Sequence, residues 1–307
     1  MSEKLLLRAL STTTFSTSKD ATSWLNPLLW SRKIEDFARA NLVVAPLGVQ
    51  NTELLTRPGE AIRIAKDAAI TAAAVADSTS LALQALSYSG ITVTPQEYGG
   101  AFAITRAELD RAMANLVNEK ASNAGYALAK VKDDTIYAAL IAGAGSTKYQ
   151  NAKSAVTSLA STDTFDTTLI ADGVTEMRTN NRSPLYLIIH PKYEGRLLKN
   201  SNFIDASKYG GRESVLNGEI GRYLGLKVFS TTVASSIAAG TASSHIGYSA
   251  MILGPRAFVH AQKRRPTIDS KYEPLDRAFS VAFVEDWGAT VLNATEIVNL
   301  VAFETSG

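Results

Sequence analysis

The longest regular pattern of apolar residues lies between residues 115 and 142. Here apolar side chains recur at alternating intervals of four and three residues, as on one face of an α-helix. The members of this stripe are Val117, Ala121, Ala124, Leu128, Val131, Ile136 and Leu140. Gly143 and Gly145 follow and are suited to ending a helix. At 1.5 Å per residue the helix would extend about 40 Å, which predicts a spine for a large, flat molecule.

Residues 97–104 (EYGGAFAI) predict a strand that leads directly into this helix. Thr105 and Glu108 have the T-x-x-E spacing of a capping box, in which the two residues cap the first turn of a helix reciprocally. We therefore expect Thr105 to begin the helical region, with a break near Asn115 before the long stripe.

The segment from residue 52 to residue 94 is rich in alanine, serine and threonine between two alternating stretches. Residues 61–65 and 88–94 predict strands, and Arg57-Pro58-Gly59 predicts a turn. Alanine and serine have little apolar area to bury, so a hairpin built this way needs a partner surface. The alternative is an ordinary helix over 68–86, because alanine favours helix.

Beyond residue 145 the pattern changes to short helices and strands. We predict a helix over 165–178 capped by Thr164, a buried strand over 185–189, and a helix from Pro191 through Leu198. The side chains that should face the core from the first of these helices are Leu169, Ile170, Val174 and Met177.

Strands dominate the rest of the chain. Those predicted lie at 226–230, 248–253, 258–262, 278–284, 290–292 and 296–303. Residues 264–276 are charged and predict a connector, and residues 285–288 (EDWG) predict a turn. We expect strands 88–104 and 256–303 to share a sheet packed on the long helix, with 146–253 as a second lobe, which is an α+β fold.

Composition limits the chemistry of this 307-residue chain. It has 31 Lys+Arg against 29 Asp+Glu, a formal charge of +2, and 46% apolar residues. A protein whose main task is to bind DNA carries a larger basic excess, so any contact with nucleic acid should be weak and local. The absence of cysteine excludes disulfides, thiolate zinc sites and cysteine nucleophiles. No stretch reaches the roughly 20 apolar residues needed to span a bilayer.

The residues that usually carry catalysis are scattered. His190, His245 and His260 form no metal-binding pair, and neither a G-x-S-x-G elbow nor a G-x-x-x-x-G-K-[ST] phosphate loop is present. Gly218, Gly221 and Gly225 lack dinucleotide-binding spacing and predict a tight turn before a strand. We therefore assign no catalytic, cofactor or metal residue and expect a structural protein, not an enzyme.

A family resemblance is carried by three segments in a fixed order. EYGGAFAITRAELDRA, LYLIIHPKYEGRLLKNSNFIDASKYGG and LNGEIGRYLGLKVFSTT resemble segments of major capsid proteins of tailed double-stranded DNA viruses with the Hong Kong 97-type fold, and the resemblance covers most of residues 40–300. The parts it implies are an N-terminal arm (1–45), an E-loop region (46–94), a peripheral domain with the spine helix (95–145 and 256–307) and an axial domain (146–255).

The resemblance implies a subunit that self-assembles into pentamers and hexamers of an icosahedral shell around a double-stranded DNA genome. It implies synthesis in the host cytoplasm, location in the virion capsid, no membrane, and portal, scaffolding and decoration proteins as further partners. Only about 45 residues precede the first resembling region, which argues against a fused scaffold and leaves a separate one open. Lys66 has no evident partner for a cross-link.

Charged residues supply the candidate contacts. The adjacent pairs Asp133-Asp134 and Glu285-Asp286 predict solvated surface charges or contacts to a neighbour. The basic run of Lys263, Arg264 and Arg265 would face packaged DNA or acidic residues of a neighbouring subunit, and the sequence does not decide between them. The candidate inter-subunit contacts are Arg57, Arg63, Lys66, Glu285 and Asp286.

Two other functions stay open. An encapsulin-like cellular compartment is built on the same fold, and particle contents distinguish it, because a genome favours a virus and an enzyme cargo favours a compartment. A hydrolase that uses serine with one lone histidine is the third hypothesis. Loss of activity in a His190→Ala variant that still assembles would support it.

Overall fold

A computed structural model describes residues 42–56, 59–67, 88–106, 116–197, 219–234, 236–238 and 245–305, with the single positions 72 and 199. Three predicted segments lie outside these residues. They are the arm up to residue 41, nearly all of the alternative helix over 68–86, and residues 107–115 of the helical region predicted to begin at Thr105. Within the described part of the chain, no helix has the length and apolarity needed to cross a membrane.

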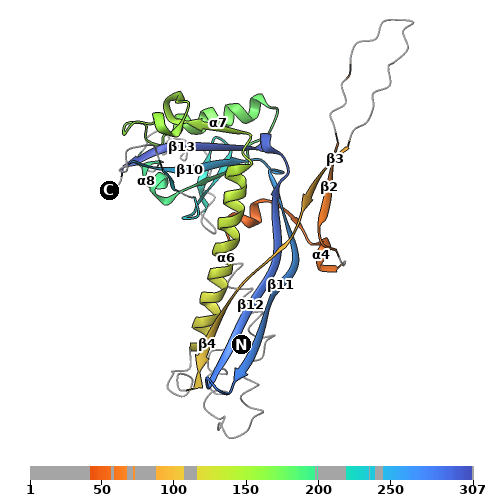
Figure 1. Cartoon of the computed structure of the whole chain (residues 1–307). Coiled ribbons are helices and arrows are strands. Elements are labelled where there is room, and N and C mark those ends of the chain that lie inside the picture. Colours follow the sequence, from red (N-terminus) through yellow and green to blue (C-terminus); the bar gives the residue numbers. More distant parts are fainter. Residues whose placement is uncertain are drawn as a thin grey trace, which may run out of the picture.

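A long helix and a long sheet form the frame of the molecule. Helix α6 runs from Leu116–Ala142 and lies along a four-stranded sheet in the order β1-β11-β12-β4 (Figure 1). The sheet strands are β1 (Val49–Asn51), β11 (Phe258–Glu273), β12 (Ala278–Val291) and β4 (Gln96–Thr105). Strands β4 and β12 pair antiparallel over ten residues, and α6 packs on both of them. The predicted spine helix and its sheet of early and late strands are therefore confirmed.

A second lobe sits at one end of this frame (Figure 1). Its sheet has the order β5-β13-β10-β6-β8-β7, with β9 paired to β10. The strands are β5 (Ser146–Tyr149), β6 (Tyr186–Ile189), β7 (Glu219–Tyr223), β8 (Leu226–Ser230), β9 (Ser236–Ala238), β10 (His245–Leu253) and β13 (Ile297–Thr305). Helix α7 (Thr167–Thr179) packs on β13, and α8 (Pro191–Leu197) follows β6. The described residues also form short helices: η1 (Ala45–Leu47), α4 (Glu53–Thr56), η2 (Gln150–Ala152), η3 (Val156–Ser158) and η4 (Ala294–Glu296).

A two-stranded hairpin projects from the frame on the side away from α6 (Figure 1). Its strands, β2 (Ile62–Asp67) and β3 (Tyr88–Val93), pair antiparallel in register from Ile62↔Val93 to Asp67↔Tyr88. Both strands predicted from the alternation at 61–65 and 88–94 are thus confirmed.

The lobe follows the apolar pattern closely but not at its caps. Leu169, Ile170, Val174 and Met177 are all buried, as predicted. Thr164 does not cap α7, and that prediction is wrong. The cap is Asp166, whose carboxylate accepts a hydrogen bond from the Thr167 amide at 2.6 Å. Thr164 instead bridges to Phe303 of β13, which removes it from the helix.

Two predicted breaks in the tail are also wrong. Strand β11 continues through residues 264–273 of the supposed connector, and β12 runs through residues 285–288. Charged residues stay within the strands because Arg264 pairs with Asp286 of the neighbouring strand, at register shifts in the ladder. The turn at 274–277 is the only break between β11 and β12, and Arg277 adopts a φ of 49° there.

Strand β13 lies in the other sheet from the one expected. We predicted that it joins the strands on the spine helix, whereas it pairs with β10 and β5 in the lobe. Every residue from Ile297 to Phe303 is buried. A strand buried on both faces requires a position inside a covered sheet, and the lobe supplies one.

The glycine-rich segment before residue 226 is a hairpin turn. Leu224 and Gly225 have φ values of 51° and 86° and join β7 to β8 as a two-residue loop. Gly225 therefore fills a position that other residues occupy only with strain, and the tight turn expected there is confirmed.

Candidate functional site: the charged junction of helix and long sheet

The buried face of α6 passes through two charged residues. Positions 121, 124, 128, 136 and 140 of the predicted stripe are buried, but Val131 is 43% exposed. Its inclusion in the stripe is wrong, because a period of 3.6 residues brings Lys132 and Asp133 to the buried side of the helix at that level. Both are buried, Lys132 at 5% and Asp133 at 2% exposure. A prediction based on the spacing of apolar residues could not include these positions, because both residues are charged.

Lys132 forms an ion pair with Glu285 of β12. The Lys132 Nζ lies 2.5 Å from Glu285 Oε1, and the two side chains are 7% and 2% exposed. Gln262 donates to the same oxygen at 3.0 Å, and Lys132 Nζ lies 5.6 Å from the centre of the Trp287 ring. Trp287 in turn stacks on Tyr98 of β4 at 4.4 Å. The pair therefore joins the helix to all three long strands, and each charge is tolerated because the other is present.

Asp133 binds the chain that enters the frame. Its carboxylate accepts hydrogen bonds from the amides of Val43, Val44 and Ala45 at 2.7, 3.1 and 2.9 Å. Burial raises the pKa of Asp133, while these three bonds and Lys132 lower it. The side chain thus holds the backbone just before η1 against the spine helix, and it also serves three donors that no helix or strand satisfies.

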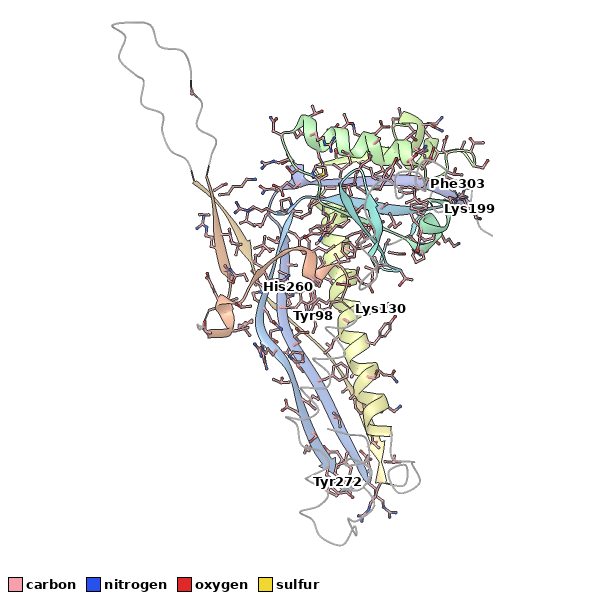
Figure 2. All side chains as sticks on the ribbon, turned by 180° about the vertical axis from the view of Figure 1, so that it is seen from behind. Tyr98, Lys130, Lys199, His260, Tyr272 and Phe303 are labelled. Atoms are coloured by element: carbon pink, nitrogen blue, oxygen red, sulfur yellow. The ribbon has the colours of Figure 1, made fainter. Side chains whose placement is uncertain are left out.

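His260 of β11 links the same junction to β1. Its Nδ1 lies 2.9 Å from the amide oxygen of Gln50, which places the imidazole proton on Nδ1, and its ring lies 5.7 Å from that of Trp287. Burial lowers the pKa of His260 to about 4, and Lys132 adds to this effect. The ring is therefore neutral at pH 7. Figure 2 shows His260 at the level of the middle of α6.

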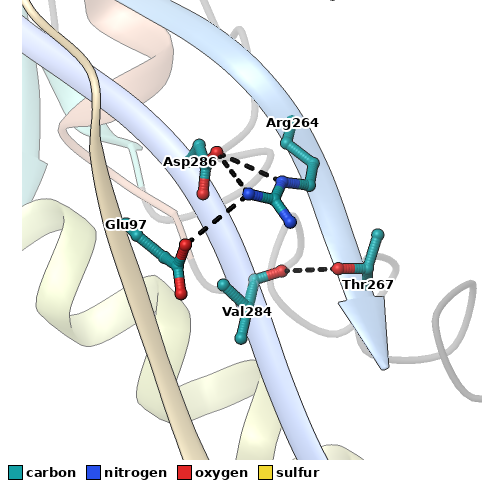
Figure 3. A network of polar contacts seen from close by, with 5 residues as sticks. All are labelled: Glu97, Arg264, Thr267, Val284 and Asp286. Carbon is teal, nitrogen blue, oxygen red and sulfur yellow. Dashed lines mark hydrogen bonds and ion pairs between the residues drawn. The ribbon is translucent and has the colours of Figure 1, made fainter. Parts of the chain in front are cut away.

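The opposite face of the sheet carries a second charged cluster (Figure 3). Arg264 Nη2 lies 2.8 Å from Asp286 Oδ2 and 3.6 Å from Glu97 Oε2. The Arg264 side chain is 48% exposed, whereas that of Asp286 is 11% exposed. Thr267 donates to the Val284 carbonyl beside them at 3.4 Å. This cluster ties β11, β12 and β4 together at the point where the β11 register shifts.

The predicted contact residues meet three different outcomes. Asp133, Glu285 and Asp286 are buried and bonded within the chain, so their expectation as solvated surface charges is wrong, whereas Asp134 is exposed. Arg63, Lys66 and Arg265 are exposed, Lys263 is half-buried, and Arg57 lies outside the described residues. Contact with a neighbouring subunit stays a prediction for all of the candidates.

The described histidines have structural surroundings. His190 stacks on Tyr248 at 3.9 Å and accepts from the Lys192 amide at 3.2 Å, and His260 bonds Gln50. The hydrogen-bonded role expected of these two is confirmed, while the His245 side chain lies outside the described residues. Sequence reasoning missed Glu296, a buried carboxylate that accepts from the Arg256 amide at 2.8 Å and lies 3.4 Å from Arg182.

The family of the chain follows from its sequence. A family model described as phage capsid protein matches residues 88–299, which covers β3, β4, the spine helix, both long strands and the lobe up to the first residues of β13. The chain belongs to the phage capsid protein family. It is a major capsid protein, a subunit of the icosahedral shell of a virion, as the resemblance implied. The match favours this function over a cellular compartment.

Solved structures show that the fold is shared. The capsid of Ralstonia phage GP4 matches with a TM-score of 0.70 and 12% identity, over 85% of this chain and 88% of that one. The Cyanophage Pam1 capsid asymmetric unit gives 0.66 and 14%, over 82% and 88%. Mycobacterium phage Che8 gives 0.62 and 17%, over 84% and 90%. The α+β fold of the Hong Kong 97 type is thereby confirmed. No curated protein sequence matches the chain.

Proposed function

We propose that the capsid protein assembles as pentamers and hexamers, and that each subunit reaches across its neighbour with the β2–β3 hairpin. The observation that carries this proposal is the projection of the hairpin from the frame (Figure 1). Arg63, Ala65 and Lys66 on β2 are exposed, and among the described side chains of the hairpin only Ile62 and Val93 are buried. Such an element gains stability when it lies on a second subunit.

The charges of the hairpin fit one surface of the frame. Arg63 and Lys66 are basic and exposed, whereas the face of the long sheet that does not contact α6 carries Glu97 and Asp269. The Glu97 side chain is 63% exposed and its contact to Arg264 is long, at 3.6 Å. We propose that the hairpin of one subunit lies on this face of the next, with the basic residues of β2 beside these carboxylates.

The charge distribution bears on a further proposed partner, the packaged DNA. Arg264 is paired with Asp286, which leaves Lys263 and Arg265 as the part of the basic run available to DNA or to a neighbour. With a net charge of +2, contacts to packaged double-stranded DNA would be weak. Synthesis in the host cytoplasm and portal, scaffolding and decoration proteins as partners belong to the same proposal. We also propose that the protein has no enzymatic activity.

Charge reversal on the hairpin tests the assembly proposal. The double variant Arg63→Glu/Lys66→Glu should yield soluble, folded subunits or capsomers that do not close into shells in negative-stain micrographs. The control is Lys120→Glu, which changes an exposed lysine on α6. Deletion of residues 60–90 should have the same effect. Normal shells from both hairpin variants would contradict the proposal, provided that thermal melts match the parent.

Particle contents test the remaining part. Particles purified from their native source should protect double-stranded DNA from nuclease, and an enzyme cargo without a genome would instead indicate a compartment. For catalysis, the parent should show no hydrolytic activity above background, and a measurable activity that is lost in an assembled His190→Ala variant would contradict this part of the proposal.

A further inference from the structure

An open groove runs along α6 on the side that faces the lobe. It consists of two adjacent hollows of about 340 and 280 Å³, which share Val233. Ala138 and Ile141 line the first, and Val43 and Tyr126 line the second. Tyr126 is 55% exposed although it lies beside the body of the protein. The groove therefore presents apolar side chains that nothing in the described part of the chain covers.

The chain enters the groove at its middle. Val43 lines the second hollow, and Asp133 holds the amides of Val43, Val44 and Ala45 on the same stretch of α6. Residues 1–41 precede this anchor. Residue 37 is six positions from Val43, a span of about 9 Å in a helix and about 20 Å if extended. Ala138 lies five positions beyond Asp133 on α6, about 8 Å along its axis. Residue 37 can therefore reach the part of the groove at Ala138.

The segment just before the anchor has the residues to fill it. Ile34, Phe37 and Ala38 share one face if residues 32–40 are helical, a spacing suited to a groove between two elements. Glu35 and Asp36 lie beside that face in sequence, and the groove carries the exposed cation Lys130 on its wall (Figure 2). The apolar residues of the segment therefore match the apolar lining of the groove, and both sides carry charges of either sign, because Asp134 also lines the groove and Arg32, Lys33 and Arg39 flank the segment.

We propose that residues 34–38 of the same chain dock in the α6 groove, with Ile34 and Phe37 against Val233 and Ala138. The Asp133 carboxylate is then a positioning residue that delivers the segment to its site. Residues 34–38, near the end of the N-terminal arm, then lie on their own subunit, which goes beyond shell formation. Only residues before 34 are free to reach a neighbour.

The cysteine-free chain allows this to be tested by disulfide trapping. Phe37→Cys or Ile34→Cys is combined with Ala138→Cys in the full-length protein, and the products are read by non-reducing gels and peptide mass spectrometry. A disulfide requires Cα atoms within about 7 Å. The matched control pairs Phe37→Cys with Lys120→Cys, which lies on α6 but about 27 Å from position 138. Electron micrographs of the same preparations report assembly separately.

The expected result is a link within one chain, in soluble protein and in shells, for at least one groove pair and not for the control. A link between chains would overturn the proposal and assign the groove to a neighbour's arm. Equal linking in groove and control pairs would also overturn it. Independently, Phe37→Ser without added cysteines should speed amide exchange at residues 230–233 and leave β12 unchanged. Unchanged exchange at 230–233 refutes docking, whether or not shells form.

Discussion

The ion pair between Lys132 and Glu285 allows a quantitative test of how the frame is held together. At 2.5 Å and an effective dielectric of about 20, the attraction is roughly 6–7 kcal/mol. Removal of both charges from water costs several kcal/mol for each ion, so the net contribution of the pair is near zero. Among the described residues Glu285 Oε2 has no hydrogen-bond partner despite its burial, which weakens the pair further.

Single and double substitutions should therefore behave very differently. Lys132→Met or Glu285→Leu alone leaves one buried charge without its partner and should lower the free energy of unfolding by about 3–5 kcal/mol. The double variant Lys132→Met/Glu285→Leu should lie within about 1 kcal/mol of the parent, because apolar side chains of similar length replace both ions. The coupling energy between the two sites would then be at least about 5 kcal/mol.

Urea unfolding of the soluble chain at pH 7 measures these values. Trp287 is a suitable probe, because it is buried, stacks on Tyr98 and lies next to Lys132. The control is Lys120→Met, an exposed lysine on the same helix, which should change stability by less than about 0.5 kcal/mol. If the effects of the two single substitutions simply add in the double variant, the reasoning about mutual dependence is refuted.

Three further predictions concern the same frame. The folded-state pKa of His260 is about 4 and lies below the unfolded value of 6.5. The contribution of the neutral ring to stability is therefore present above pH 6.5 and is lost as the pH falls towards 4. Between pH 7 and pH 4.5, urea unfolding should show that the parent loses roughly 2 kcal/mol more stability than His260→Gln. Asp133→Ala removes the acceptor of three amides and should lower the free energy of unfolding by about 1–3 kcal/mol. Asp134→Ala should be near neutral in the same urea unfolding. Equal effects of the two substitutions would count against the role of Asp133 in holding the backbone before η1. Leu275 is 97% exposed at the β11–β12 turn, so Leu275→Asp should alter stability by less than about 0.5 kcal/mol, and a larger loss would show that the turn is covered.

The errors of sequence reasoning on α6 and in the two long strands had a common origin in charge. The predicted stripe on α6 skipped Lys132 and Asp133, and the predicted breaks at 264–276 and 285–288 were placed where charged residues cluster. A charged residue in a strand or on a buried face is stable only with a partner, and these partners are far away in sequence: Glu285 is 153 residues from Lys132. The charged junction could therefore not be predicted from the sequence, because only the fold brings Lys132 and Glu285 together.

The amino-acid sequence by itself determined most of the secondary structure. The period of apolar residues defined α6, the β2–β3 hairpin, α7 and most strands, because helix and strand periodicity depend on neighbours within a few positions. Only the tertiary structure decided that β13 belongs to the lobe, that Asp133 binds the chain at Val43, and that Glu285 is buried and not solvated. Those outcomes depend on which surfaces meet across the whole chain, and burial changes the free energy of a charge by more than any local preference.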